Sequence, residues 1–353
     1  MCCVDHLISQ PKAVVSLCGG CTGRLSGQYL DRRKIQSPSF SQIIDALPSK
    51  HGVDFMDRPH LSIVGSGIAG TSFGILAARA GWTVAGVGGR NARRAMESAR
   101  QMGDSIRSCS IREAAGLGDI VLLTVSDDSI ESVCNELVDH SCFREGASIL
   151  HCSGALSSAV LASAKQRLKC TIGSAHPLQT FPNVESALAK IPKSYCFCEG
   201  DATLLPSVQE FLKSIGLRQI QIDEDAKVLY HAAAVIACNY FVSLLDISLE
   251  VGESAGIQRD VFLDALEPLV AATLQNVTRI GVDRALTGPI ARGDVQTVRK
   301  HLAALSDMNQ GSGPVWEAYN ALGVHTTQIA ARRGSIDTET MNLLRTLLGA
   351  PRT

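Results

Sequence analysis

Short apolar runs alternate with amphipathic segments over residues 58–223. The runs LSIV, TVAGVG, DIVLLTV and ASILHCSG have the length of buried strands, and helix-like patterns follow the first and the third of them. Short connections join these segments, which is typical of a parallel sheet with helices on both faces. The pattern predicts an α/β fold with a doubly wound, Rossmann-type sheet.

The pattern changes after Asp223, where the strand-like runs stop. Only helical patterns follow, over 225–254, 258–280, 294–305, 312–333 and 337–348. We therefore expect three parts, namely an extension over 1–57, a Rossmann domain over 58–223 and an all-α domain over 224–353. The extension has weak periodicity, and it is interpreted as a poorly ordered segment, a targeting piece or a start placed too early.

The segment over 225–250 is long and mostly apolar, yet it carries Lys227, His231, Asn239, Asp246 and Glu250. At 100° per residue these five side chains share one side of a helix, and the rest of the circumference is apolar. Such a pattern predicts a buried central helix whose polar side faces a cleft. His231 and Asn239 argue against a membrane span, because burying both in lipid is costly.

Composition narrows the function classes. The 353 residues are 45% hydrophobic and carry a net charge of -1, which gives no basis for a nucleic-acid or acidic-membrane partner. Twelve cysteines are scattered, several of them within apolar runs, so we interpret most as buried free thiols in a reducing, cytoplasmic setting. The pair Cys18 and Cys21 forms one CxxC without a second, so no metal site is predicted.

Residues 65–70 read GSGIAG, a GxGxxG motif directly after an apolar strand and at the start of a helix. In this context Gly65 permits the tight turn, Gly67 lets the backbone approach a pyrophosphate, and Gly70 allows close packing of helix and strand. The helix N-terminus offers unpaired N–H groups to phosphates. We therefore expect Ser66 and Ile68, together with these glycines, to bind a dinucleotide.

The end of the second strand indicates which dinucleotide. An NAD site has an acidic residue there, but this chain has Arg90 followed by Asn91. A guanidinium can bind a 2′-phosphate with paired, charge-assisted hydrogen bonds, which favours NADPH over NADH. Ser126, at the end of a later strand, is a further cofactor contact.

Reduction of a carbonyl or an imine needs a proton donor and polar groups that stabilise the developing charge. Lys227 or His231 is the predicted donor, and Asn239 is expected to orient the substrate. His176, in the loop sequence AHPLQTF, and Arg292, in LTGPIARGD, are predicted substrate-binding residues, since Arg292 can bind a carboxylate in a bidentate way. Arg292 can equally pair with Asp294.

Several of these segments together resemble a poorly characterised bacterial family: the glycine motif with GGRN, the HCSG turn with Ser153, AHPLQTF, YHAAAVIACNY and LTGPIARGD. Members of this family have a Rossmann-like NADP-binding domain and a helical domain of unknown function. The layout is also similar to ketopantoate reductase, 6-phosphogluconate dehydrogenase and pyrroline-5-carboxylate reductase. The resemblance implies a site between the domains, to which Ser153 would contribute, and a helical domain that often dimerises, hence a homodimer.

Three functions are compatible with these features. The first is NADPH-dependent reduction of a small 2-oxo acid such as ketopantoate, and the second is reduction of an imine of the pyrroline-5-carboxylate type. The third is a non-catalytic nucleotide-binding protein. Lys227 matches the catalytic lysine of the β-hydroxyacid dehydrogenases, but His231 stands where that group has asparagine, which leaves the mechanism open.

Overall fold

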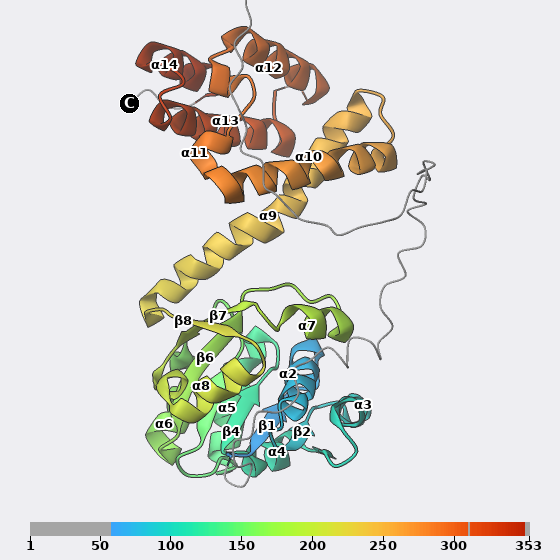
Figure 1. Ribbon diagram of the computed structural model, residues 1–353, viewed down its shortest axis with the longest axis vertical. Helices are drawn as coiled ribbons and strands as arrows, with labels where there is room; N and C mark the ends of the chain where they lie inside the picture. The colour runs from blue at the N-terminus through green and yellow to red at the C-terminus, as the bar shows by residue number, and fades with distance from the viewer. Residues whose placement is uncertain (1–57, 310, 350–353) are drawn as a thin grey trace, which may run out of the picture. The chain divides into compact units, whose positions relative to one another are not determined.

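The computed structural model describes residues 58–309 and 311–349 (Figure 1). The expectations for the extension, including those for Cys18 and Cys21, lie outside the described residues.

An eight-stranded sheet forms the core of the first part, with its strands in the order β3-β2-β1-β4-β5-β6-β7-β8 (Figure 1). The strands are β1 (Leu61–Val64), β2 (Val84–Gly88), β3 (Arg107–Cys109), β4 (Ile120–Leu123), β5 (Ser148–His151), β6 (Thr171–Pro177), β7 (Tyr195–Glu199) and β8 (Arg218–Gln221). All pairings from β3 to β6 are parallel, which confirms the doubly wound fold that the apolar pattern predicted.

The last two strands depart from a wholly parallel sheet. β7 pairs with β6 in antiparallel fashion, and β8 runs parallel to β7. Between β6 and β7 the chain forms α7 (Val184–Lys190), which packs against α2 (Ile68–Arg79), and Leu178 N donates to Tyr195 O over 2.8 Å. The chain therefore re-enters the sheet at the edge where β6 ended, so its direction reverses.

Helices cover both faces of the sheet and bury separate apolar cores (Figure 1). One face carries α2, α3 (Ala92–Met102), α7 and α8 (Pro206–Ser214), and the other carries α4 (Ile111–Leu117), α5 (Asp127–Asp139) and α6 (Ala162–Leu168). Successive strand residues point to opposite faces. Ile63 therefore belongs to the first core and Val64 to the second, and each is 0% exposed.

Helices make up the described chain beyond β8. They are α9 (Lys227–Ser254), α10 (Arg259–Ile280), α11 (Val282–Ala285), α12 (Val295–Asn309), α13 (Pro314–Arg332) and α14 (Thr338–Leu347). The five long ones coincide with the five helical patterns of the sequence. A small core that includes Val298, Ala330 and Leu344 stabilises this region.

The prediction that the first long helix is buried is wrong for the single chain. Of its 28 residues only Lys227, Leu249 and Gly252 are buried. An apolar composition indicates that burial of the helix surface is favourable, but it does not show whether the same chain or another chain buries it. The segment Glu224–Ser254 is also long and apolar enough to cross a membrane by length and composition, although a core helix can pass the same test.

The cysteines follow the expectation in part. All eight in the described part of the chain are free thiols. Cys134, Cys196 and Cys198 are buried, as their apolar neighbours predicted, and Cys170 is buried too. Cys238, which also lies in an apolar run, is exposed on α9.

Candidate active site

The turn between β1 and α2 is built by close backbone packing. Gly65 has φ +123°, and a side chain on it would meet the carbonyl carbon of Thr124 at 2.6 Å. A methyl group on Gly70 would lie 2.0 Å from Gly65 O, whereas one on Gly67 would meet nothing within 4 Å. Thr124 Oγ1 donates to Gly65 O over 2.8 Å and links this turn to the end of β4. The turn is therefore closed behind Gly65 and Gly70 and open in front of Gly67.

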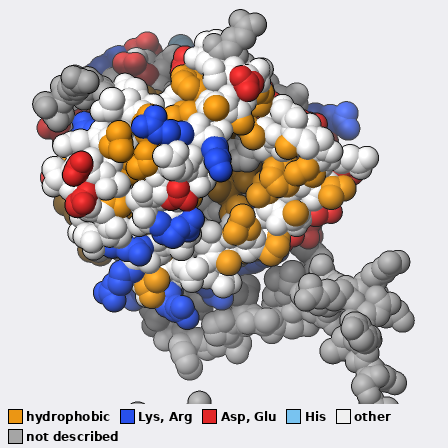
Figure 2. Space-filling view, turned by 90° about the horizontal axis from the view of Figure 1, so that it is seen from above, with side chains coloured by type: hydrophobic (Ala, Val, Ile, Leu, Met, Phe, Trp, Pro, Cys, Tyr) orange, Lys and Arg blue, Asp and Glu red, His pale blue; other side chains and the backbone are white. Residues whose placement is uncertain are grey.

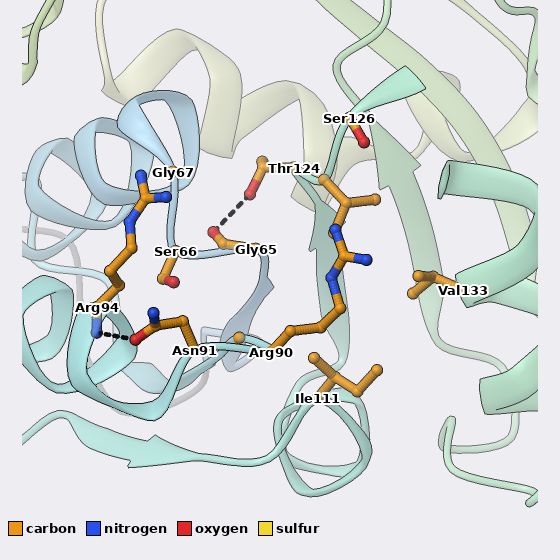
Figure 3. Close-up of a pocket in the computed structure, with 12 residues that line it drawn as sticks. Gly65, Ser66, Gly67, Arg90, Asn91, Arg94, Ile111, Thr124, Ser126 and Val133 are labelled. Atoms are coloured by element: carbon orange, nitrogen blue, oxygen red, sulfur yellow. Dashed lines mark hydrogen bonds between the residues drawn. The ribbon is translucent and has the colours of Figure 1, made fainter. Parts of the chain in front are cut away.

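The open side of the turn is a cavity of about 290 Å³ (Figure 3). No side chain caps the N-terminus of α2, and no acidic residue lies in its first turn. The first N–H groups and the positive end of the helix dipole are therefore available to an anion. This combination fits the pyrophosphate of a dinucleotide.

Two arginines from the end of β2 and the start of α3 lie on either side of the turn (Figure 3). Arg90 and Arg94 line the cavity, and within the described residues neither guanidinium forms an ion pair. Asn91 is the N-cap of α3, where its side chain accepts from Arg94 N over 3.0 Å. Arg93 points elsewhere and pairs with Glu97 at 3.0 Å.

Most of the predicted cofactor residues meet at this cavity, namely Gly65, Ser66, Gly67, Arg90, Asn91 and Ser126. Ile68 and Gly70 are not among its lining residues, and Gly70 acts through packing. Arg94 and Thr124, which also line the cavity, were not among the predicted cofactor residues. The position of Thr124 directly after a buried strand, at the carboxyl edge of the sheet, was the signal that could have found it.

A second polar cluster lies at the carboxyl ends of β4, β5 and β6. Ser153 Oγ donates to Asp127 Oδ2 over 2.6 Å and accepts from Ala155 N and Leu156 N. His151, on β5, is buried and accepts from Ser153 N at Nδ1 over 3.2 Å. Burial, followed by the charge of Lys227, lowers the pKa of His151 to about 4, so this imidazole is neutral at pH 7. Ser153, a predicted substrate residue, is thus already fully hydrogen-bonded within the protein.

Lys227, the first residue of α9, is 0% exposed. Its Nζ donates to Ser174 Oγ and lies 3.8 Å from Glu199 Oε1. Glu199, which is 2% exposed, also accepts from the backbone N and the Oγ of Ser158, each over 2.7 Å. Burial lowers the pKa of Lys227, and Glu199 counteracts this shift. The structure therefore places Lys227 in an ion pair that joins α9 to the sheet, and its role as proton donor stays a prediction from sequence.

One turn further along α9, aromatic residues contact the end of β6. His176 Nδ1 and Tyr230 OH are 2.9 Å apart, and the ring of Tyr230 stacks on Phe197 with centroids 4.2 Å apart. The ring of His231 lies edge-on to that of His176 at 5.9 Å. His231 Nδ1 is buried and has no hydrogen-bond partner within residues 58–309 and 311–349. Burial, followed by the charges of Lys227 and His231, lowers the pKa of His176 to about 4, and burial raises that of Tyr230 to about 12.

Two predicted residues do not join this cluster. Asn239 is exposed and lies nine residues beyond Tyr230, which is about 14 Å along a helix axis at 1.5 Å per residue. Arg292 is exposed in the short helix Ile290–Arg292, beside Asp294. The pKa of Asp294 is lowered first by hydrogen bonds from Thr297 and then by Arg292. Asp246, on the same side of α9, pairs with Arg259.

The glycine turn, the cavity beside it and the polar groups along the same sheet edge define a Rossmann-type dinucleotide-binding fold. Residues 48–177 match the Rossmann-like domain family, and residues 194–326 match DUF2520, a domain of unknown function. The chain thus carries a Rossmann-like domain followed by a DUF2520 domain, as the resemblance in its sequence predicted. The DUF2520 match begins before β7, so it includes the last two strands of the sheet.

Solved structures share this fold over most of the chain. Protein TM1727 from Thermotoga maritima is 26% identical with a TM-score of 0.60, over 78% of this chain and 99% of that protein. A reductive aminase from Aspergillus terreus, in complex with NADPH4, cyclohexanone and allyl amine, is 17% identical with a TM-score of 0.55, over 83% and 99%. An imine reductase variant from Myxococcus stipitatus, in complex with NAD+, is 17% identical with a TM-score of 0.54, over 83% and 100%. No curated protein matches the sequence. The chain therefore has the fold of these solved structures.

Proposed function

We propose that the protein is an NADPH-dependent reductase of a small 2-oxo acid, with ketopantoate as the specific candidate. One observation carries the proposal, namely that the glycine turn and the His176 cluster lie at the carboxyl edge of one sheet. β6 is three strands from β1, about 14 Å at the usual strand spacing. Ligands of open α/β sheets bind along this edge, so a dinucleotide that begins at the turn extends toward His176.

Local geometry supports NADPH as the cofactor. The first turn of α2 would hold the pyrophosphate, and Arg90 and Arg94 would hold the 2′-phosphate of the adenosine ribose. The cofactor supplies a hydride, that is, a proton with two electrons. In NAD sites an acidic side chain binds the 2′-hydroxyl of the ribose. No acidic residue is among the described residues that line this cavity, so this contact is missing.

The reduced oxygen also needs a proton from a group within hydrogen-bond reach. His231 fits this role better than Lys227. His231 Nδ1 has no hydrogen-bond partner in the described part of the chain, whereas the ammonium of Lys227 is engaged by Ser174 and Glu199. Substrate recognition by Arg292 and orientation by Asn239 require contacts beyond those of the described chain.

Reduction of an imine is the second candidate, and Asp127 is the observation that favours it. Asp127 is exposed at the same sheet edge, and its carboxylate accepts a hydrogen bond from Ser153 Oγ. A carboxylate there would stabilise the positive charge of a protonated imine. The fold similarity to imine reductases and reductive aminases is compatible with either reaction.

We further propose that the chain works as a homodimer in an aqueous, reducing compartment such as the cytoplasm. α9 exposes Leu229, Ile236 and Tyr240 by 60% or more, and α10 exposes Leu269 and Leu274 to a similar extent. Figure 2 shows hydrophobic side chains gathered around a hollow on the face that it draws. Monomeric proteins rarely leave contiguous apolar surface of this kind in water. A second copy of the chain would cover it.

The test is NADPH oxidation by the full-length chain, followed by absorbance, over a panel of 2-oxo acids and a panel of cyclic imines. We expect turnover of a 2-oxo acid at least tenfold above that of any imine. The reverse order would support the imine reductase, and no turnover of either class would favour the non-catalytic nucleotide-binding protein.

A matched pair of variants localises the site. His231→Ala should lower turnover at least tenfold and leave NADPH affinity, measured by fluorescence titration, unchanged. His140→Ala, at an exposed histidine that ends α5, is the control and should behave as the wild type.

A further inference from the structure

We propose that Tyr230 holds His176 in the tautomer with its proton on Nε2, and that His176 Nε2 and His231 Nδ1 together bind the carbonyl oxygen of the substrate beside Gly154. The inference rests on the proposed reductase function and deepens it, because it names the atoms that recognise the reacting group.

The two imidazoles converge on one point. A methyl group placed on Gly154 would lie 2.5 Å from His231 Nδ1 and 2.9 Å from His176 Nε2. Both distances end at the same position, so the two nitrogens lie close together. One acceptor atom can bridge two nitrogens that are up to about 5.8 Å apart, because each hydrogen bond is about 2.9 Å long. Because Gly154 has no side chain, both ring nitrogens can approach its Cα and lie close to one another.

One of these nitrogens is unsatisfied in the protein. His231 Nδ1 is buried and has no hydrogen-bond partner among the described residues. A buried polar atom without a partner costs roughly 1–3 kcal/mol, so proteins seldom retain one unless a ligand or water completes it. This orphan faces Gly154 and His176, which points to a ligand atom at that position.

Tyr230 sets the direction of the hydrogen bonds. Its hydroxyl is 2.9 Å from His176 Nδ1, and stacking on Phe197 fixes the ring. A phenol is a better donor than a neutral imidazole, and an imidazole nitrogen is the better acceptor. Tyr230 OH therefore donates to Nδ1, and the proton of neutral His176 resides on Nε2, where it faces Gly154.

The direction of these hydrogen bonds determines which chemical class of ligand can bind. The pKa of His176 is lowered to about 4, mainly by burial, so the ring is uncharged and Nε2 can only donate. With the proton of His231 on Nδ1, the two nitrogens form a donor pair. Such a pair suits a carbonyl oxygen, which accepts two hydrogen bonds and gains negative charge during reduction. A protonated imine nitrogen is itself a donor and has no acceptor at this position.

The first test needs neither cofactor nor turnover. In protein labelled with ¹⁵N-histidine, long-range ¹H–¹⁵N spectra distinguish the two tautomers of a neutral imidazole. We expect His176 in the Nε2–H form in the wild type and a mixture of tautomers in Tyr230→Phe. An Nδ1–H form of His176 in the wild type, or a tautomer that Tyr230→Phe does not change, would overturn the proposal.

The chain contains a matched control for this spectrum. His301 Nδ1 and Tyr319 OH are also 2.9 Å apart, in the helical part of the chain. Tyr319→Phe should change the His301 signals and leave those of His176 unchanged. If it altered His176 as Tyr230→Phe does, the effect would not be local to the proposed pair, and the inference would fail.

The second test asks what binds. Oxamate, an unreactive analogue of a 2-oxo acid, is added to the NADP+ complex, and cyclohexylammonium serves as a donor-only cation. We expect oxamate to shift His176 Nε2 and His231 Nδ1, and cyclohexylammonium to shift neither. Shifts from the cation alone, or from neither probe at millimolar concentration, would reject the carbonyl site.

Gly154→Ala completes the design, because its methyl group would press on both ring nitrogens without removing a polar group. Oxamate affinity should fall at least tenfold, while circular dichroism and NADP+ affinity stay as in the wild type. Unchanged oxamate affinity would contradict the inference. Since these measurements report binding and tautomers, they stand even if the panel of carbonyls and imines shows no turnover.

Discussion

Arg90 and Arg93 are three residues apart, yet they differ in what engages their charge. Arg90 lines the cavity at the glycine turn and has no ion pair among the described residues, whereas Arg93 pairs with Glu97 on the surface of α3. A guanidinium contributes to phosphate recognition only where it can face the phosphate without competition. The side chain that directly follows the strand is the one in that position.

Arg90→Ala should therefore lower the preference for NADPH over NADH about tenfold or more. A hydrogen bond to a charged group contributes roughly 1.5–3 kcal/mol, and 1.4 kcal/mol is a factor of ten. The check is kcat/KM for both cofactors. Arg93→Ala is the control, and an equal loss in both variants would show that the effect is one of general surface charge.

The buried ion pair between Lys227 and Glu199 is expected to contribute to the free energy of unfolding. Both are almost completely buried, so removing one partner leaves a charge without compensation. Lys227→Met should destabilise the protein by about 3–5 kcal/mol in urea unfolding, and adding Glu199→Gln should restore a large part of it.

An exposed pair is the control for this cycle. Arg112 and Glu136 lie 3.0 Å apart but are 49% and 42% exposed, so Arg112→Met should cost less than about 1 kcal/mol. If Lys227→Met were as mild as Arg112→Met, the buried pair would not join α9 to the sheet as we infer.

At the scale of elements, the β1–α2 turn contains one glycine that serves packing and another that serves ligand binding. Gly70 brings α2 against the turn, where any side chain would overlap Gly65 O, while Gly67 faces open space. The two glycines of one motif therefore perform different tasks, one toward the protein and one toward the ligand.

Gly70→Ala should lower the melting temperature by several degrees, because backbone atoms would have to move. Gly67→Ala should melt like the wild type and bind NADPH at least tenfold more weakly, since its methyl group would occupy cofactor space. Thermal unfolding and fluorescence titration separate the two. Equal melting losses would mean that Gly67 also serves packing.

At the scale of the whole molecule, the main unusual feature is the apolar surface that α9 exposes to solvent in the single chain. Leu229, Ile236 and Tyr240 are spaced by seven and four residues, so they lie on one stripe of the helix. A stripe of this kind is stable in water when another helix covers it, and a second copy supplies one without any further component.

Light scattering coupled to gel filtration should show a dimer of the 37.5 kDa chain. Leu229→Glu with Ile236→Glu should convert it to a monomer, because both charges would enter the interface. Leu204→Glu is the control, since Leu204 is 60% exposed next to α8 and should not affect assembly. A wild-type monomer would remove the proposal.

The sequence alone determined the parts of this protein that depend on local order. Strand periodicity, the GxGxxG context and the arginine after the second strand predicted the Rossmann-type sheet and half of the residues that line its cavity, because each rests on a few consecutive residues. The five long helices followed from apolar spacing in the same way. The reversed direction of β7 and β8 escaped this reasoning, since it depends on where α7 packs, and so did the exposure of α9 in the single chain.

Tertiary structure decided the polar cluster. His176 and Tyr230 are 54 residues apart and meet only through the fold, so local spacing along the chain could not predict their hydrogen bond. Helical spacing put Lys227, His231 and Asn239 on one side of α9 but could not say that Lys227 turns into the sheet while Asn239 faces solvent. Side-chain spacing defines directions within one element, whereas chemistry depends on which other element stands opposite, and that is decided by packing.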